Sequence, residues 1–285
     1  MRAQTSASSR PEGSVEPIKL VALDIDGTLL DGERLIPEAN RWAISRAREK
    51  GVKVVLATAR AFLSAMPFAQ ELNLDTPLIC TNGALIKDLA DVEWWSKRIQ
   101  LDVARQIAAW ADAGGHVLVT LIGDYIYYTW SAPWVGEGWE PRPYDRVVGS
   151  NLAPLTTPPL CITAVGEETS RALLDRFAFQ VGGKVRFDRY ERDGRLLSVI
   201  AVHAAATKEG ALAFLCARWG LSASQTMALG DNLPDLGMLR WAGIGVAMGN
   251  APLEMHERVK WVAPSNDQAG VAWAIERFVL GEEDL

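Results

Sequence analysis

The chain alternates between short apolar runs and stretches with helical periodicity. The first run, Leu20 to Leu23 resumed at Ile25, lacks the alternation of a half-exposed strand and is typical of a strand buried in a parallel sheet. Similar runs predict further strands at 52–57, 77–80, 226–229 and 243–248. Amphipathic patterns predict helices at 37–50, 61–72, 208–219, 234–241, 252–258 and 267–280. Strands and helices joined in turn by short connections imply parallel pairs, so the pattern predicts an α/β fold with a mainly parallel sheet.

The pattern changes near Leu85 and returns at Lys208. Two runs in between meet at Gly123-Asp124, a hairpin signal that makes their strands antiparallel. The middle segment predicts helices at 101–113 and 168–180, and strands at 116–122, 125–130, 160–165, 184–190 and 196–203. We therefore expect a second α/β domain inserted into the first. The predicted parts are a tail at 1–17 that is rich in Ser, Pro, Gly and Glu and disordered, a core at 18–86 plus 199–285, and an inserted cap at 87–198.

Polar side chains follow several core strands at the point where each strand ends. Asp24 and Asp26 end the first run, and side chains two apart on extended chain share a face. Ligands of open α/β sheets bind at the carboxyl ends of strands, so this pair is placed for a metal or a reaction, although a plain strand-ending turn also uses Asp and Gly. Thr58, Asn82 and Asp231 follow three other strands. Thr58 fits either an anionic oxygen or a helix cap.

Composition narrows the functional classes. Of the 285 residues, 49% are hydrophobic and 22% charged, an ordinary balance for a globular protein of one large or two modest domains. The formal charge of -6 and the lack of a basic stripe argue against nucleic-acid binding. Cys80, Cys161 and Cys216 are far apart in apolar surroundings and are predicted to be reduced core residues. No run is long enough for a membrane span and no signal-peptide pattern begins the chain, so we expect a cytoplasmic protein.

The polar residues at the strand ends form an ordered set of motifs. The set consists of Asp24-Ile25-Asp26-Gly27-Thr28, then Thr58, then Lys208 after Thr207, and then Gly230-Asp231 with Asp235. In order and spacing it resembles the haloacid dehalogenase superfamily, in particular the Cof-type, sugar-phosphatase-like branch with a large α/β cap. The resemblance covers roughly residues 18 to 280 and implies a Rossmann-like, doubly wound core with an inserted α/β cap domain.

The resemblance also implies a chemistry for each motif. Asp24 would attack phosphorus to form an aspartyl-phosphate, and Asp26 would act as general acid and base. Mg²⁺ would be held by Asp24, Asp26 through its backbone carbonyl, and Asp231, with Asp235 in support. The phosphorylated substrate would be bound by Thr58, Lys208, Asn82 and Arg60.

Two positions depart from the family pattern. Pro234 precedes Asp235 where the family often has Asn, which removes an amide that helps to order the metal site. Ala59 stands where the branch commonly has Gly, and its methyl group narrows the approach to Arg60. These departures make Asp235 and Arg60 less secure members of the site than Asp24 or Lys208.

Three functions fit the motifs. The first is a Mg²⁺-dependent phosphatase, an enzyme that hydrolyses a small phosphorylated metabolite such as a sugar phosphate or a similar phosphomonoester. The alternatives are a phosphomutase of the same superfamily and a non-enzymatic phospho-acceptor or ligand sensor. Asp26 argues against the sensor, which needs no general acid. The expected partner is the small phosphorylated metabolite, with neither nucleic acid nor membrane, and the chain is expected to be a monomer or homodimer.

Overall fold

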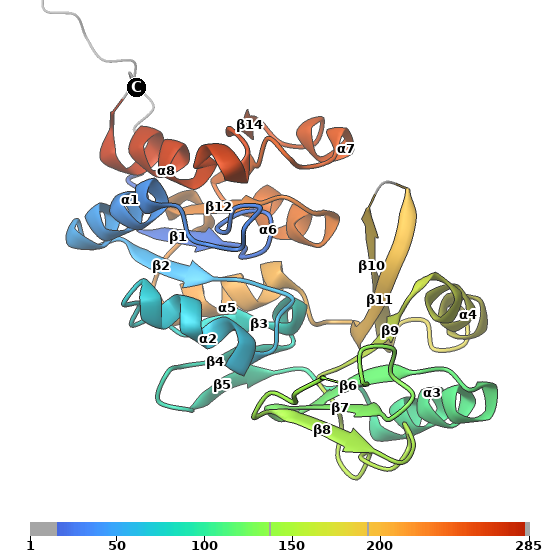
Figure 1. The fold of residues 1–285 in the computed structure, drawn as a ribbon. Helices are drawn as coiled ribbons and strands as arrows, with labels where there is room; N and C mark the ends of the chain where they lie inside the picture. The colour runs from blue at the N-terminus through green and yellow to red at the C-terminus, as the bar shows by residue number, and fades with distance from the viewer. Residues whose placement is uncertain (1–15, 137, 193, 283–285) are drawn as a thin grey trace, which may run out of the picture.

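The computed structural model describes residues 16–136, 138–192 and 194–282, so the predicted tail at 1–17 falls almost entirely outside the described residues. The central element is a five-stranded parallel sheet with the order β14-β13-β12-β1-β2 (Figure 1). Its strands are β1 (Leu20–Leu23), β2 (Lys53–Leu56), β12 (Thr226–Gly230), β13 (Ile244–Ala247) and β14 (Trp261–Val262). The prediction of a mainly parallel α/β core is confirmed, and β14 is an edge strand of two residues that the apolar pattern did not indicate.

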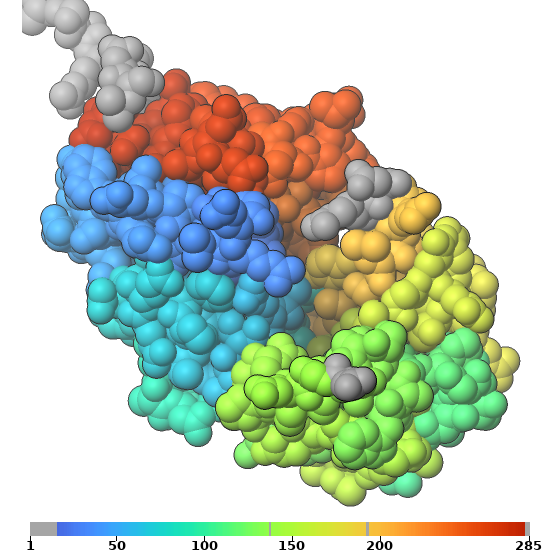
Figure 2. All heavy atoms as spheres, in the orientation of Figure 1, coloured from blue at the N-terminus to red at the C-terminus, as the bar shows by residue number. Residues whose placement is uncertain are grey.

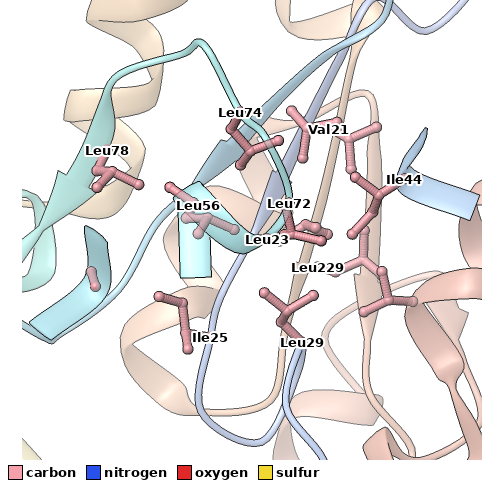
Figure 3. Close-up of a cluster of buried hydrophobic side chains, with 14 of the residues drawn as sticks. Val21, Leu23, Ile25, Leu29, Ile44, Leu56, Leu72, Leu74, Leu78 and Leu229 are labelled. Atoms are coloured by element: carbon pink, nitrogen blue, oxygen red, sulfur yellow. The ribbon is translucent and has the colours of Figure 1, made fainter. Parts of the chain in front are cut away.

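Helices cover both faces of this sheet because alternate side chains of β1 point to opposite sides. Val21 and Leu23 join one apolar cluster with α1 and α8, as Figure 3 shows for Ile44 of α1. Leu20 and Ala22 join a second cluster with α5 and α6. The helices of the core are α1 (Glu38–Glu49), α2 (Phe62–Glu71), α5 (Lys208–Trp219), α6 (Leu236–Trp241), α7 (Leu253–His256) and α8 (Gly270–Ile275). The core is therefore doubly wound, as expected.

Two predicted helices are interrupted in the structure. The segment predicted as a helix at 234–241 starts with the 3₁₀ turn Leu233–Asp235, and α6 follows it. The segment at 267–280 contains the turn Asn266–Gln268, then α8, then a π-helical turn at Glu276–Leu280. Each starts in a turn in which a side chain caps the backbone N–H groups, a local bond that competes with the helix.

The third predicted strand, β3 (Leu78–Cys80), only touches the parallel sheet. One parallel bridge joins Ala57 to Ile79. Its full pairing is antiparallel, in a three-stranded sheet with β4 (Leu85–Lys87) and β5 (Glu93–Ser96). The chain reverses there because the turn Thr81–Gly83 has positive φ angles throughout.

A six-stranded sheet with the order β10-β11-β9-β6-β7-β8 forms the second lobe, which we call the cap lobe. Its strands are β6 (Leu118–Ile122), β7 (Tyr125–Thr129), β8 (Asp145–Val148), β9 (Cys161–Val165), β10 (Val185–Arg192) and β11 (Arg195–His203), and its helices are α3 (Leu101–Gly114) and α4 (Glu167–Phe177). The hairpin at Gly123-Asp124 is confirmed. Strand β8 was not predicted because it lies in a passage rich in Pro and Gly, where tertiary pairing with β7 outweighs local propensity.

The cap sheet is covered on both faces. Helices α3 and α4 pack on one face, around Ile107, Ile162 and Leu173. From the other face Leu121 and Val202 enter the apolar cluster of the core. We propose that the two lobes are separate domains, with core and cap joined where β5 leads to α3 and where β11 leads to α5.

Other sequence expectations can be compared directly with the structure. Pro37 lies at the N-cap of α1 rather than at its first helical residue, and Gly51 has the left-handed φ of +80° predicted for a helix end. Cys80, Cys161 and Cys216 are free and buried, as expected. Among the described residues, no helix is both long enough and apolar enough to cross a membrane.

Gly245 of β13 tests the packing between the sheet and α6. An added Cβ would lie 2.0 Å from the backbone oxygen of Leu239, so the Gly245→Ala substitution forces backbone to move. We expect it to lower the free energy of unfolding by about 1–3 kcal/mol, measured by urea denaturation. Gly149→Ala is the control because its Cβ would meet no atom within 4 Å. Equal unfolding midpoints for the two variants would contradict the described packing.

Candidate active site

A cavity of about 430 Å³ lies at the carboxyl end of the five-stranded sheet, between the two lobes. The surface is recessed where the gold β10–β11 hairpin meets the blue and cyan core (Figure 2). The cap lobe contributes Tyr190, Glu191 and Leu197 to the cavity wall. The sequence-predicted residues that line the cavity are Asp24, Asp26, Thr58, Lys208, Asp231 and Asp235. The fold thus brings six predicted site residues from four separate segments to one cavity.

Lys208 is the buried cation of the site. It is the first residue of α5, whose N-cap Thr207 accepts a hydrogen bond of 2.9 Å from the backbone N–H of Gly210. Its Nζ lies 2.6 Å from Asp24 Oδ1 and 2.5 Å from Asp235 Oδ1. Burial by itself would lower the pKa of Lys208, but the charges of Asp235 and Asp24 outweigh burial and raise that pKa. Lys208 therefore stays protonated between two carboxylates.

Three carboxylates gather around this lysine. Burial raises the pKa of Asp24 well above its usual value, Lys208 offsets part of the rise, and the charges of Asp235 and Asp231 add to it. Burial and then the charge of Asp235 raise the pKa of Asp231 to about 7, although a 2.8 Å hydrogen bond from the Thr28 hydroxyl favours its ionised form. The single positive charge of Lys208 therefore does not balance the three carboxylates.

The same carboxylates fit a divalent cation. Asp24, Asp231 and Asp235 each offer an oxygen, and these oxygens lie within 4.8 Å of one another. Carboxylate oxygens are hard ligands of the kind that Mg²⁺ prefers. A Cβ on Gly27 would lie 2.4 Å from Asp231 Oδ2, so only glycine permits this approach of the loop to the carboxylate. The donor set and the raised pKa values therefore suit a bound cation.

Asp235 is held more tightly by its own chain than the other two acids. Its Oδ1 faces Lys208, and its Oδ2 accepts hydrogen bonds from the backbone N–H groups of Asp231 and Asn232, at 3.2 and 3.0 Å. Pro234 lies inside this turn, and the Asn232 side chain caps it by accepting from the N–H of Leu233 at 2.9 Å. The turn is ordered although the usual Asn is missing, and Asp235 is placed to support Lys208 and the Asp231 backbone.

Asp26 and Arg60 form a pair at the edge of the cavity. The Arg60 Nε and Nη2 atoms donate to the two Asp26 oxygens at 2.7 and 2.6 Å. The Asp26 side chain is 56% exposed and lies outside the carboxylate cluster. Arg60 also stacks on Phe68, 4.7 Å from the ring centroid, and is not among the described residues that line the cavity. In this structure Arg60 and Asp26 therefore form an ion pair with each other.

Thr58 and Asn82 occupy different positions relative to the cavity. Thr58 is buried and lines it, and its hydroxyl accepts a 3.1 Å hydrogen bond from the backbone N–H of Arg60. Asn82 instead directs its amide to Asp188 and Tyr190 of β10. The structure therefore gathers Thr58 with the carboxylates, and it leaves Asn82 and Arg60 in other contacts.

Two residues that shape the site, Asn250 and Asn266, were given no role from the sequence. Asn250 donates from its amide to the backbone oxygen of Gly27 at 2.8 Å, and its oxygen accepts from the N–H of Asn266. Asn266 in turn donates to the backbone oxygen of Leu30 at 2.8 Å. These bonds fix the loop after Asp26. No local pattern in the sequence indicates which backbone groups these two asparagines bind.

The family assignment agrees with this arrangement. A family model described as haloacid dehalogenase-like hydrolase matches residues 21–275. The chain belongs to this family. The matched range includes every residue of the carboxylate cluster and Lys208, and it spans both lobes.

Known proteins similar to this haloacid dehalogenase-like hydrolase cover nearly its whole length. Stress response protein YhaX of Bacillus subtilis is 30% identical over 280 residues, which cover 91% of this chain and 93% of that protein. The 5-amino-6-(5-phospho-D-ribitylamino)uracil phosphatase YcsE of the same organism is 30% identical over 274 residues, which cover 92% of this chain and 96% of that protein. A crystal structure of a haloacid dehalogenase-like hydrolase from Bacteroides thetaiotaomicron superposes with a TM-score of 0.80 at 26% identity. The superposition covers 91% of this chain and 99% of that chain.

Asp231 provides a test of the charge balance in the metal-free hydrolase. Because its pKa is raised from 3.8 to about 7, the folded state holds a proton that the unfolded state has lost, and stability falls as pH rises through this window. The Asp231→Asn substitution removes this pH-dependent loss of stability, and the Asn side-chain oxygen can still accept the hydrogen bond from the Thr28 hydroxyl. We expect its Tm in EDTA to exceed that of the wild type at about pH 8, by about 2–4 °C for each kcal/mol relieved, with the difference shrinking toward about pH 4.

Asp175→Asn is the matched control because Asp175 is exposed on α4, far from the cluster. It is expected to change Tm little at either pH. A gain for Asp231→Asn that is as large at acidic pH as at alkaline pH would show that the carboxylate charge is not its cause.

Proposed function

We propose that this protein is a Mg²⁺-dependent phosphatase that hydrolyses a small phosphorylated metabolite through an aspartyl-phosphate on Asp24. That the chain is a phosphomonoester hydrolase follows from its family and from relatives named phosphatases. The metal, the residue roles and the substrate class are the proposal. The observation that carries it is the cluster of buried Asp24, Asp235 and Lys208 with half-buried Asp231, at the strand ends beneath the cap lobe.

Asp24 is the proposed nucleophile. One of its oxygens attacks the phosphorus atom while the bond from phosphorus to the substrate oxygen breaks, which leaves the phosphoryl group on Asp24. Lys208, 2.6 Å from Asp24 Oδ1, supplies fixed positive charge beside the incoming phosphoryl oxygens. Thr58, buried in the cavity wall, is the proposed hydrogen-bond donor to one of those oxygens.

Asp26 is the proposed general acid and base. It gives a proton to the leaving oxygen, and it later takes a proton from the water that attacks the aspartyl-phosphate and releases phosphate. Its position at the cavity edge suits contact with the leaving group and with water. Both Asp26 oxygens accept hydrogen bonds from Arg60 in this structure, so this pair has to open before Asp26 can contact the leaving group.

The cation would be held by Asp24, Asp231 and the backbone carbonyl of Asp26, with Asp235 supporting the site. When bound, it supplies positive charge that reduces the repulsion between the carboxylates and the phosphate dianion. The oxygen donor set and the raised pKa values of Asp24 and Asp231 support this role.

The substrate class is proposed from the family and its relatives. A sugar phosphate or a similar phosphomonoester remains the proposal, and the name of the YcsE relative adds a phosphorylated ribitylaminouracil to the compounds worth testing. Relatives named phosphatases favour transfer to water over the phosphomutase alternative. Binding of substrate by Arg60 and Asn82, a cytoplasmic location and a monomeric or homodimeric state remain predictions.

The direct test is release of inorganic phosphate from a panel of sugar phosphates, FMN, pyridoxal phosphate and 5-amino-6-(5-phospho-D-ribitylamino)uracil. Wild-type protein is expected to release phosphate from at least one of them, and Asp24→Asn to lower kcat by roughly 10⁴-fold or more because an amide cannot form the acyl-phosphate. Asp175→Asn should keep full activity. Retention of more than a few per cent of activity by a folded Asp24→Asn protein would exclude Asp24 as the nucleophile.

Metal dependence is tested by removal and replacement. EDTA is expected to abolish phosphate release and Mg²⁺ to restore it, whereas Ca²⁺ should not. Ca²⁺ accepts more ligands at longer distances, so both oxygens of Asp24 could bind it and be lost for attack. Full activity in EDTA, or equal support by Ca²⁺, would refute the proposed metal site.

A further inference from the structure

The turn Thr81–Gly83 between β3 and β4 lies at the junction of three parts of the site. The backbone N–H of Asn82 donates to the oxygen of Thr58 at 3.0 Å, and that of Thr81 donates to the oxygen of Arg60 at 3.0 Å. A Cβ on Gly83 would lie 2.1 Å from the backbone oxygen of Thr207. The turn is therefore packed between the loop after β2 and the start of α5, where Lys208 lies.

From this turn the Asn82 side chain reaches the cap lobe. Its Nδ2 donates to Asp188 Oδ2 at 2.8 Å and to the Tyr190 hydroxyl at 2.9 Å. The Tyr190 hydroxyl donates to Asn82 Oδ1 at 3.2 Å. Asn82 is 1% exposed, so these contacts are shielded from water. Both amide hydrogens and the amide oxygen are thus used by β10 in this structure.

The partners of Asn82 are themselves fixed. Arg186 holds Asp188 through two hydrogen bonds of 2.7 and 2.8 Å, and it also donates to the backbone oxygen of Ala206, in the segment that links β11 to α5. In the part of the chain that the structure describes, the bonds of Asn82 and the Arg186 bond to Ala206 are the side-chain hydrogen bonds that join the β10–β11 hairpin to the core. The lower end of β11 also has an apolar contact with the core, because Val202 joins the core cluster together with Leu121.

The two partners of Asn82 line different open spaces. Tyr190 lines the candidate active-site cavity, and Asp188 lines a second cleft of about 380 Å³. Lys208 lines both. Loss of the Asn82 contact would leave the hairpin with one side-chain hydrogen bond toward the core, from Arg186 to the Ala206 oxygen, and with the apolar contact of Val202.

We propose that Asn82 is a positioning residue: it latches the β10–β11 hairpin to the core and so sets where Tyr190, Glu191 and Leu197 meet the organic part of the substrate. The latch itself is a property of the free protein. Only the last step, contact with substrate, rests on the proposed function.

Asn82→Asp tests the latch because Asp also tolerates the left-handed backbone, φ +53° here, while its carboxylate faces Asp188. We expect amide hydrogen exchange in β10 and β11 to become at least about tenfold faster, with β1 and β12 unchanged. With p-nitrophenyl phosphate, we expect KM to rise about tenfold while kcat changes less than about threefold. Adding Asp188→Asn to Asn82→Asp restores an amide facing a carboxylate. The double variant is expected to bring both the exchange rate of the hairpin and KM part of the way back to the wild-type values.

Asn73→Asp is the matched control, because Asn73 is exposed and has a similar φ of +52° at the end of α2, away from the cap lobe. It should leave hairpin exchange and KM unchanged. Unchanged exchange in the hairpin of Asn82→Asp would overturn the latch, and so would a fall in kcat without faster exchange, which would indicate support of Thr58 or Lys208 instead. Faster exchange in a chain that hydrolyses no phosphomonoester would keep the latch and refute the proposed function.

Discussion

The pairing of one buried lysine with two buried carboxylates is the interaction on which the site depends. Asp24, Asp231 and Asp235 lie close together at the end of a sheet that is covered on both faces, and the burial of Asp24 and Asp235 weakens the screening of their repulsion by water. Lys208 neutralises part of this charge from within hydrogen-bond distance of Asp24 and Asp235. Since burying an ion pair costs solvation free energy, the cluster is explained better by its chemistry than by stability.

The fold of the core brings these charged side chains close together. Strands β1 and β12 are parallel neighbours in register from Leu20 with Thr226 to Leu23 with Leu229, so Asp24 and Asp231 emerge at the same edge. Lys208 reaches the same edge because it is the first residue of α5. The backbone of Gly83 packs closely against Thr207, the N-cap of this helix, and this contact fixes the start of α5. The same turn carries Asn82 to the cap lobe, so the position of the lysine and the position of the cap share one structural support.

Most of the core elements could be predicted because each is a local pattern. The apolar run at β1 and the helix ended by Gly51 need no knowledge of the rest of the chain. Strand β8 could not be predicted in the same way, since its residues become a strand only by pairing with β7. Strand β3 was predicted as a strand, but its antiparallel partner depends on the positive φ angles of the turn that follows it.

The sequence by itself determined which residue types stand at the strand ends, in which order, and hence the family and the candidate chemistry. Only the tertiary structure decided their partners. Lys208 pairs with Asp24 across 184 positions, Asn82 with Asp188 across 106, and Arg60 with Asp26 across 34. Spacing along the chain reports which side chains share a strand or a helix face, whereas hydrogen-bond partners follow from distances that packing alone sets. For that reason two polar residues predicted to bind substrate, Arg60 and Asn82, are in this structure held by Asp26 and by the cap lobe.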